Sequence, residues 1–202
     1  MHHSRTAGWT NGYCYKVRQL LSKHGFRDVW LLQTHLYFHH VFSRRITDEF
    51  IQDWQSNMSS SFNRKLDTYA LLKKTYVFEK YLTYGLAKPC RVLLTKLRIS
   101  NHSLEVERGR YAKPVIPRDL RFCNCCMNEI GDECHFVMFC TCNAELRKQL
   151  FTSLNITITS SNNQSVFKEL HVLKCNSYHA TRMFAKFVYA SFKRKEAVSQ
   201  AG

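Results

Sequence analysis

The chain has 202 residues, 45% of them hydrophobic, which is enough to bury a core in one domain or in two small ones. The formal net charge of +15 is spread along the chain and predicts an acidic partner, with nucleic acid first and an anionic membrane surface second. The N-terminal residues lack the apolar run of a secretory signal, and no window reaches the about 18 apolar residues of a spanning helix, so we expect neither segment.

Helix-forming residues dominate the sequence. Only seven glycines and three prolines are present, and long stretches of Leu, Phe, Lys and Glu favour an all-α fold. Residues 1–45 are predicted to form an N-terminal helical segment, with one helix over 13–23 that stops at Gly25. The apolar stretch 29–42 fits either a buried helix or a strand, and we assign it to helix.

Residues 46–120 are predicted to form a small helical domain that ends in a basic loop. Thr47, followed by two acidic residues, has the pattern of an N-cap and is expected to begin the first helix. Residues 66–76 and 78–84 fit two short helices. The basic loop is residues 101–117, where two prolines and a glycine interrupt the apolar periodicity.

A further helix of this domain is predicted to begin at Pro89, because proline is favoured in the first helical turn. Its inward face is expected to carry the apolar side chains Val92, Leu93, Leu94 and Leu97. Lys96 and Arg98 are expected to point elsewhere.

Residues 143–202 are predicted to form a C-terminal helical segment that packs back on the domain. Asn143 has the chemistry of an N-cap for its first helix. After a polar loop at 160–165, residues 166–173 and 179–193 are expected to form a final pair of helices with an aromatic inner face.

Residues 121–142 are predicted to form a zinc-knuckle-like module inserted between the helical parts. Residues 121–140, RFCNCCMNEIGDECHFVMFC, hold five of the nine cysteines and a histidine. They contain a C-x2-C pair and an H-x4-C pair separated by eight residues. A structural zinc ion takes four such ligands as two close pairs. The expected ligands of one structural zinc ion are Cys123, Cys126, His135 and Cys140.

Other arrangements of these cysteines remain open. Cys125 is able to replace a neighbouring ligand, Cys142 is able to replace Cys140, and Cys134 also lies beside the proposed set. The alternative without a metal is a cluster of small buried thiols. Disulfides are less expected, because we predict an intracellular protein, in the nucleus or cytoplasm, where thiols stay reduced.

The expected zinc site is structural rather than catalytic. A closed set of four protein ligands leaves no position for a reactive water, and the order of residues matches neither the H-E-x-x-H nor the deaminase pattern. Asp132 and Glu133 are therefore expected to be solvated or to orient His135. The chain is not expected to be an enzyme or to take a small-molecule substrate.

The residues before and within the cysteine cluster resemble the C-terminal region of reverse transcriptase polyproteins from non-LTR retrotransposons. The resemblance covers about residues 50–147 and departs from the family at CNCC, which stands in place of a simple C-x-x-C. In chain order it is carried by Leu97-Arg98, His102, Leu104–Glu107, Gly109-Arg110-Tyr111, Cys123, Cys126, Asp132-Glu133, His135-Phe136 and Cys140.

This resemblance implies a module that binds zinc and nucleic acid, RNA or DNA. The sequence contains no Y-x-D-D motif and no recognisable nuclease carboxylates, so no polymerase or nuclease activity is expected. Tyr111 and Phe122 are candidates to stack on unpaired bases. The predicted nucleic-acid contacts are Lys96, Arg98, His102, Arg108, Arg110, Tyr111, Lys113, Arg118 and Arg121. The alternative is a zinc-stabilised helical protein-interaction module without a nucleic-acid role.

Overall fold

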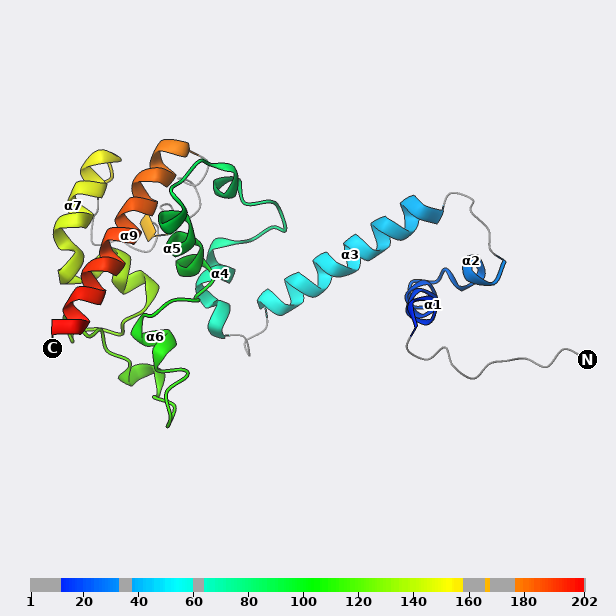
Figure 1. Cartoon of the computed structure of the whole chain (residues 1–202), viewed down its shortest axis with the longest axis horizontal. Coiled ribbons are helices and arrows are strands. Elements are labelled where there is room, and N and C mark those ends of the chain that lie inside the picture. Colours follow the sequence, from blue (N-terminus) through cyan, green and yellow to red (C-terminus); the bar gives the residue numbers. More distant parts are fainter. Residues whose placement is uncertain (1–11, 33–37, 60–63, 158–165, 168–176, 202) are drawn as a thin grey trace, which may run out of the picture. The chain divides into compact units, whose positions relative to one another are not determined.

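Helices are the only regular elements in the computed structural model over the residues that it describes, 12–32, 38–59, 64–157, 166–167 and 177–201. One isolated bridge joins Phe122 to Ile130. The all-α prediction is thereby confirmed. The chain divides into two compact units, Met1–Ser59 and Ser60–Gly202, and the boundary expected at residue 45 falls inside a helix of the first unit (Figure 1).

The first unit contains α1 (Tyr13–Lys23), α2 (Arg27–Leu32) and α3 (Phe38–Ser59). Helix α1 ends as predicted, because Gly25 adopts the left-handed φ of 78° that glycine accommodates without steric cost. The rings of Phe26, Phe38 and Phe42 pack together with centroid separations of 5.3 to 6.0 Å. These contacts hold the start of α3 against the turn after α1.

Thr47 does not begin a helix, and that prediction is wrong. It lies in the middle of α3, where its hydroxyl donates a 2.8 Å hydrogen bond to the carbonyl of Ser43 in the preceding turn. Packing of Phe38 and Phe42 on Phe26 extends the helix upstream of the capping pattern. In the apolar stretch before it, residues 33–37 lie outside the described part of the chain.

The second unit contains five α-helices in its described residues, together with several short turns. Its α-helices are α4 (Asp67–Leu72), α5 (Lys88–Arg98), α6 (Glu105–Arg108), α7 (Ala144–Ser153) and α9 (Tyr178–Ala201). The turns between them include the 3-10 turns η1 (Arg64–Leu66), η2 (Lys80–Thr83), η3 (Arg118–Leu120) and η5 (Thr141–Asn143), and the π turn η4 (His135–Phe139). Within the described residues, no helix is both long and apolar enough to cross a membrane.

The two short helices expected between residues 66 and 84 are smaller than predicted. The first shortens to η1 and α4, and the second to the single turn η2. Between them the chain is extended from Lys73, whose ammonium group binds the carbonyl oxygen of Val77 and the carboxylate of Glu79. These contacts hold residues 73–79 in a non-helical conformation, and the helix therefore ends at Leu72.

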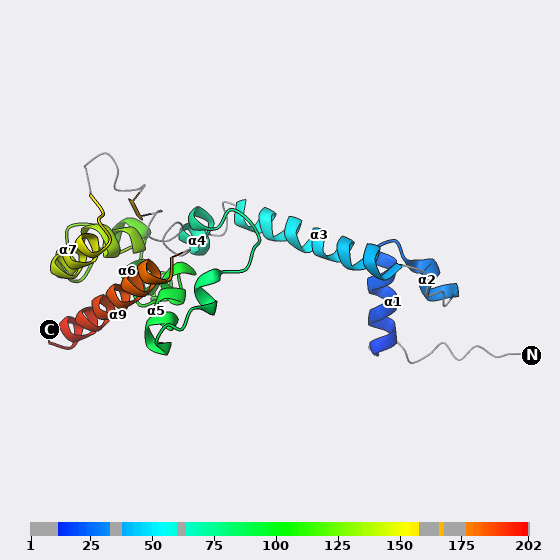
Figure 2. The same ribbon diagram turned by 90° about the horizontal axis from the view of Figure 1, so that it is seen from above.

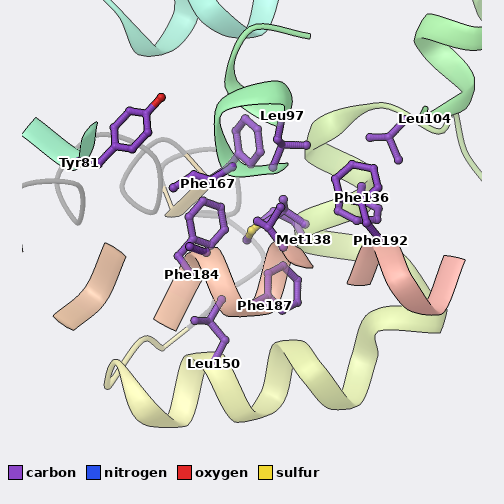
Figure 3. Close-up of a cluster of buried hydrophobic side chains, with 14 of the residues drawn as sticks. Tyr81, Leu97, Leu104, Phe136, Met138, Leu150, Phe167, Phe184, Phe187 and Phe192 are labelled. Carbon is purple, nitrogen blue, oxygen red and sulfur yellow. The ribbon is translucent and has the colours of Figure 1, made fainter. Parts of the chain in front are cut away.

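Helix α9 packs against both α5 and α7, and together they enclose the core (Figures 1 and 2). Leu94 and Leu97 of α5 and Phe184 of α9 are fully buried. Each such side chain contributes about 1.5–3 kcal/mol relative to an exposed one. Figure 3 shows that Phe136, from the cysteine-rich segment, lies beside Phe192 of α9, with ring centroids 4.6 Å apart.

Helix α5 begins with Pro89 in its first turn as predicted. The burial of two of its side chains differs from the prediction. Val92 is 39% exposed, whereas Arg98 is only 3% exposed. The prediction that Arg98 points away from the core is wrong, because its guanidinium group pairs with Glu79 at 3.1 Å and lies over the ring of Tyr81. A buried partner and an aromatic face make this burial favourable.

Two of the three helices expected in the C-terminal residues are present in the described part of the chain, as α7 and α9. Asn143 directly precedes α7, yet its side chain makes no capping bond and instead donates a 3.0 Å hydrogen bond to the carbonyl of Phe136. Val166 and Phe167 are buried in the core, and residues 168–173 of that expected helix lie outside the described part. The last helix, α9, is longer than the predicted 179–193.

Candidate metal centre

The four predicted ligands come together in the second unit. One ligand atom from each of Cys123, Cys126, His135 and Cys140 lies within 4.8 Å of all the others. The two cysteines of the first pair lie on the loop after η3, and His135 and Cys140 lie at the start and just after the end of η4. This cluster could hold a metal ion.

The first ligand pair is placed by a tight turn of the backbone. The amide of Met127 donates to the carbonyl of Cys123, and the amide of Cys123 donates to the carbonyl of Glu129, both at 2.8 Å. Met127 closes the turn with a left-handed φ of 55°. Beyond it, Gly131 leaves room for Glu105, because a Cβ atom there would lie 2.2 Å from a carboxylate oxygen of Glu105.

One distance in the cluster equals the value expected for two sulfur ligands of a tetrahedral zinc ion. Two Zn–S bonds of about 2.3 Å at the tetrahedral angle place their sulfurs about 3.8 Å apart. The Sγ atoms of Cys123 and Cys140 are 3.8 Å apart, and the Sγ of Cys126 is 3.2 Å from Nε2 of His135. A small cavity of about 10 Å³ next to the cluster is lined by Cys123, Cys125, His135 and Cys140, and Cys126 is not part of its lining. It has room for about one water-sized particle.

Glu129 orients the histidine of this cluster. Its carboxylate lies 2.9 Å from Nδ1 of His135, so Nε2 faces Cys126 as the ligand atom. Such a carboxylate fixes the tautomer and raises the basicity of a metal-binding imidazole. Asp132 acts on the backbone instead, accepting a 2.8 Å hydrogen bond from the amide of His135.

The thiol groups favour a shared negative charge. The contact between the Sγ atoms of Cys123 and Cys140 lowers the pKa of Cys123 below its ordinary value and raises the pKa of Cys140. Burial opposes protonation of His135, but hydrogen bonds to Cys123 and Glu129 outweigh it and raise the pKa of His135 to about 9. Since a metal needs thiolate and neutral imidazole, metal binding displaces protons from the cluster.

The three remaining cysteines of the segment separate into two kinds. The Sγ atoms of Cys125 and Cys142 lie within 4.8 Å of each other and of Cys140, so these three form a second group. Cys134 belongs to neither group and packs against the hydrophobic core. Burial raises the pKa of Cys125 to about 12 and that of Cys134 to about 11. Cys134 therefore fits the role of a small, partly buried thiol.

Glu133 contacts a different histidine from the one expected. One of its carboxylate oxygens lies 2.9 Å from Nε2 of His102 and accepts a 2.6 Å hydrogen bond from the hydroxyl of Ser100. These contacts outweigh burial and lower the pKa of Glu133 to about 2. Because Ser100 bonds to the carboxylate and not to the imidazole, this group lacks the contact of a serine nucleophile with its base. It ties the cysteine-rich segment to the end of α5.

Two predicted nucleic-acid contacts lie inside the protein. The side chain of His102 is 0% exposed and bonds to Glu133, and Arg98 pairs with Glu79 beneath the surface. The distribution of basic residues along the sequence does not show which of them are buried and which are exposed. In this conformation neither side chain reaches a ligand outside the protein.

The other predicted contacts lie at or near the surface. Arg110 pairs with Glu107 at 3.1 Å, and Arg118 lies 3.6 Å from Asp67 and 3.9 Å from Asp132. Arg121 donates hydrogen bonds to the carbonyls of Ile116 and Val106, and this half-buried side chain shapes the basic loop. The remaining four are exposed, Lys96, Arg108, Tyr111 and Lys113.

One of these exposed residues, Arg108, lines a hollow of about 240 Å³. Its lining includes the apolar side chains of Ile116, Leu120 and Phe122 and the cationic side chains of Arg108 and Arg121. Phe122 is 39% exposed, so part of its ring is accessible. The hollow combines an aromatic face with guanidinium groups.

Two further cations bind main-chain carbonyls of the cysteine-rich segment. Arg147 of α7 donates to the carbonyl of Cys140 at 3.0 Å, and Arg194 of α9 donates to the carbonyl of Cys142 at 2.8 Å. Neither of these arginines was predicted from the sequence, and neither was Glu129. Charge and spacing gave no signal for them, because only the packing of α7 and α9 brings these arginines to the cluster.

Comparison with known proteins identifies no relative: no protein-family model, curated protein or solved structure matches the chain. The resemblance to the reverse transcriptase region therefore stays a prediction from the quoted residues. Function has to be argued from the chemistry of the site.

Proposed function

We propose that the chain is a zinc-binding, nucleic-acid-binding module without polymerase or nuclease activity of its own, as its resemblance to the reverse transcriptase C-terminal region suggests. One zinc ion bound by Cys123, Cys126, His135 and Cys140 stabilises the segment that carries the basic surface. The tetrahedral spacing of the two sulfurs, 3.8 Å apart, supports zinc as this ion.

The hollow beside Phe122 is the observation that supports nucleic acid as the partner. An unpaired base stacks on an aromatic ring, and neighbouring guanidinium groups bind phosphate. Arg108 and Arg121 line the same hollow as Phe122. In this proposal single-stranded RNA or DNA places one base against Phe122 and its backbone along Arg108 and the exposed Lys113.

The net charge of +15 is consistent with nucleic acid as the partner. The salt dependence of binding tests this proposal. Binding to phosphates releases counterions, so the logarithm of affinity falls linearly with the logarithm of salt concentration, with a slope of about −0.7 per neutralised phosphate of a single strand. Fluorescence anisotropy with labelled single-stranded RNA, single-stranded DNA and duplex measures this slope on the full chain. We expect the single strands to bind more tightly than duplex.

A pair of matched variants localises the contact. The double variant Arg108→Ala/Lys113→Ala should reduce the slope by about 1.4, since it removes two phosphate contacts. The control is Arg182→Ala/Lys186→Ala, which removes two exposed cations from the N-terminal half of α9. Equal loss of affinity in both variants would mean that binding follows overall charge, and the proposed surface would be wrong.

A second candidate function is a zinc-stabilised protein-interaction module. The observation that favours it is the extended stretch before η2, where Val77 is 62% and Phe78 is 70% exposed. A partner that covers these side chains would bind through apolar contact and would show little salt dependence. Weak binding to every oligonucleotide at low salt would favour this function over the first.

A further inference from the structure

The second group of thiols next to the candidate zinc centre is not explained by a single ion. The Sγ atoms of Cys125, Cys140 and Cys142 lie within 4.8 Å of one another. In the candidate zinc site, Cys140 is joined by three other ligands, Cys123, Cys126 and His135. Cys140 is thus the one residue that both groups share, and Cys125 and Cys142 are left without a role in the first site.

The backbone places these three thiols from two sides of the cluster. Cys125 lies in the turn that also carries Cys123 and Cys126, which is closed by the bond from Met127 to Cys123. Cys140 and Cys142 lie at the start of η5, where the amide of Asn143 donates a 3.1 Å hydrogen bond to the carbonyl of Cys140. Both cysteine segments are therefore held by main-chain hydrogen bonds.

Cationic side chains surround the group and compensate negative charge on the sulfurs. Arg147 and Arg194 bond to the carbonyls of Cys140 and Cys142. Lys195, only 7% exposed, lies near Cys125 and Cys123 and is held 2.5 Å from Glu105. A cluster of several thiolates is stabilised by such an environment.

We propose that Cys125, Cys140 and Cys142 bind a second soft cation of the zinc type, with the Cys140 sulfur bridging the two ions. Thiolate ligands select soft ions over magnesium or calcium. Three protein ligands leave one of the four zinc positions for water or a small exchangeable ligand. On binding, the thiols of Cys125 and Cys142 release their protons to solvent.

The inference rests on the proposed zinc at the first site and extends it to a two-ion cluster. Native mass spectrometry of the reduced full chain tests both, with zinc added first to one equivalent and then in excess, followed by cadmium as a heavier probe of the same sites. We expect a second bound ion in the wild-type chain. The double variant Cys125→Ser/Cys142→Ser should bind one ion, and the control Cys134→Ser should bind two.

Alkylation with N-ethylmaleimide, mapped on peptides, gives a readout that does not depend on the folding of a variant. With one equivalent of zinc, Cys125 and Cys142 should react while Cys123 and Cys126 are protected. With excess zinc or cadmium, Cys125 and Cys142 should become protected as well.

The possible failures are distinct. A wild-type chain that stops at one ion in excess zinc and cadmium would overturn the second site and leave the first intact. A second ion that the double variant still binds would also overturn it. A chain that binds no ion at all would contradict the proposed zinc centre itself.

Discussion

Glu129 and His135 form a carboxylate–imidazole pair, with Oε2 of Glu129 2.9 Å from Nδ1 of His135. The other ring nitrogen, Nε2, faces the sulfur of Cys126 at 3.2 Å. The pair therefore fixes which nitrogen of the imidazole is available to a metal. The two residues are six positions apart in sequence, and the bend before η4 brings their side chains together.

Glu129→Gln should weaken zinc binding by about 10- to 100-fold, because it removes the charge that orients and polarises the imidazole. Competition with a coloured chelator measures the affinity. The matched control is Glu145→Gln, an exposed carboxylate that bonds to Gln149 one turn away on α7. An unchanged affinity in Glu129→Gln would show that the pair has no part in metal binding.

Zinc affinity should decrease as pH falls. The pKa of His135 is raised to about 9, so the imidazole of the metal-free chain is protonated at neutral pH and has to lose its proton on binding. Below that pKa, this group alone lowers the apparent affinity by about tenfold per pH unit. The same chelator competition between mildly acidic and mildly alkaline pH measures the slope, and a flat profile would contradict the assignment of His135 as a ligand.

Replacing Arg98 should change the stability of the protein much more than replacing Lys96, although the two residues are two positions apart on α5. Arg98→Met should lower the free energy of unfolding by about 3 kcal/mol, because it breaks a buried ion pair with Glu79. Lys96→Met should change stability by less than about 0.5 kcal/mol, because Lys96 is exposed. Urea unfolding followed by circular dichroism compares them. Equal effects would contradict the structural role of Arg98.

Phe122→Ala should weaken binding of single-stranded nucleic acid by about 1–3 kcal/mol, which is roughly 5- to 150-fold, if one base stacks on its ring. The control is Phe139→Ala. Phe122 and Phe139 are both 39% exposed, and each directly precedes a proposed zinc ligand. Anisotropy titrations at one fixed salt concentration compare the two variants. A similar loss in both would assign the effect to the metal centre and not to stacking.

The helical class and the four clustered ligands were predictable, because helix propensity and the spacing of cysteine and histidine are local properties of the sequence. Thr47 shows where local signals fail, since its capping pattern is overridden by the packing of Phe42 on Phe26. The roles of Arg98 and Glu129 could be recognised only from the folded structure. The partner of Arg98 is distant in sequence, and the partner of Glu129 lies across a turn. Charge alone does not distinguish a buried cation from an exposed one.

We expect Cys123, Cys126, His135 and Cys140 to bind zinc and this binding to stabilise the second unit. The most direct measurement is native mass spectrometry of the purified chain before and after chelation, with a melting curve at each stage. At least one zinc ion should be bound per chain, and its removal should cause a loss of structure, since structural zinc contributes on the order of 10 kcal/mol of folding free energy. The Cys126→Ser variant should resemble the chelated chain. A metal-free chain with an unchanged melting curve would show that these four side chains do not form a structural zinc site.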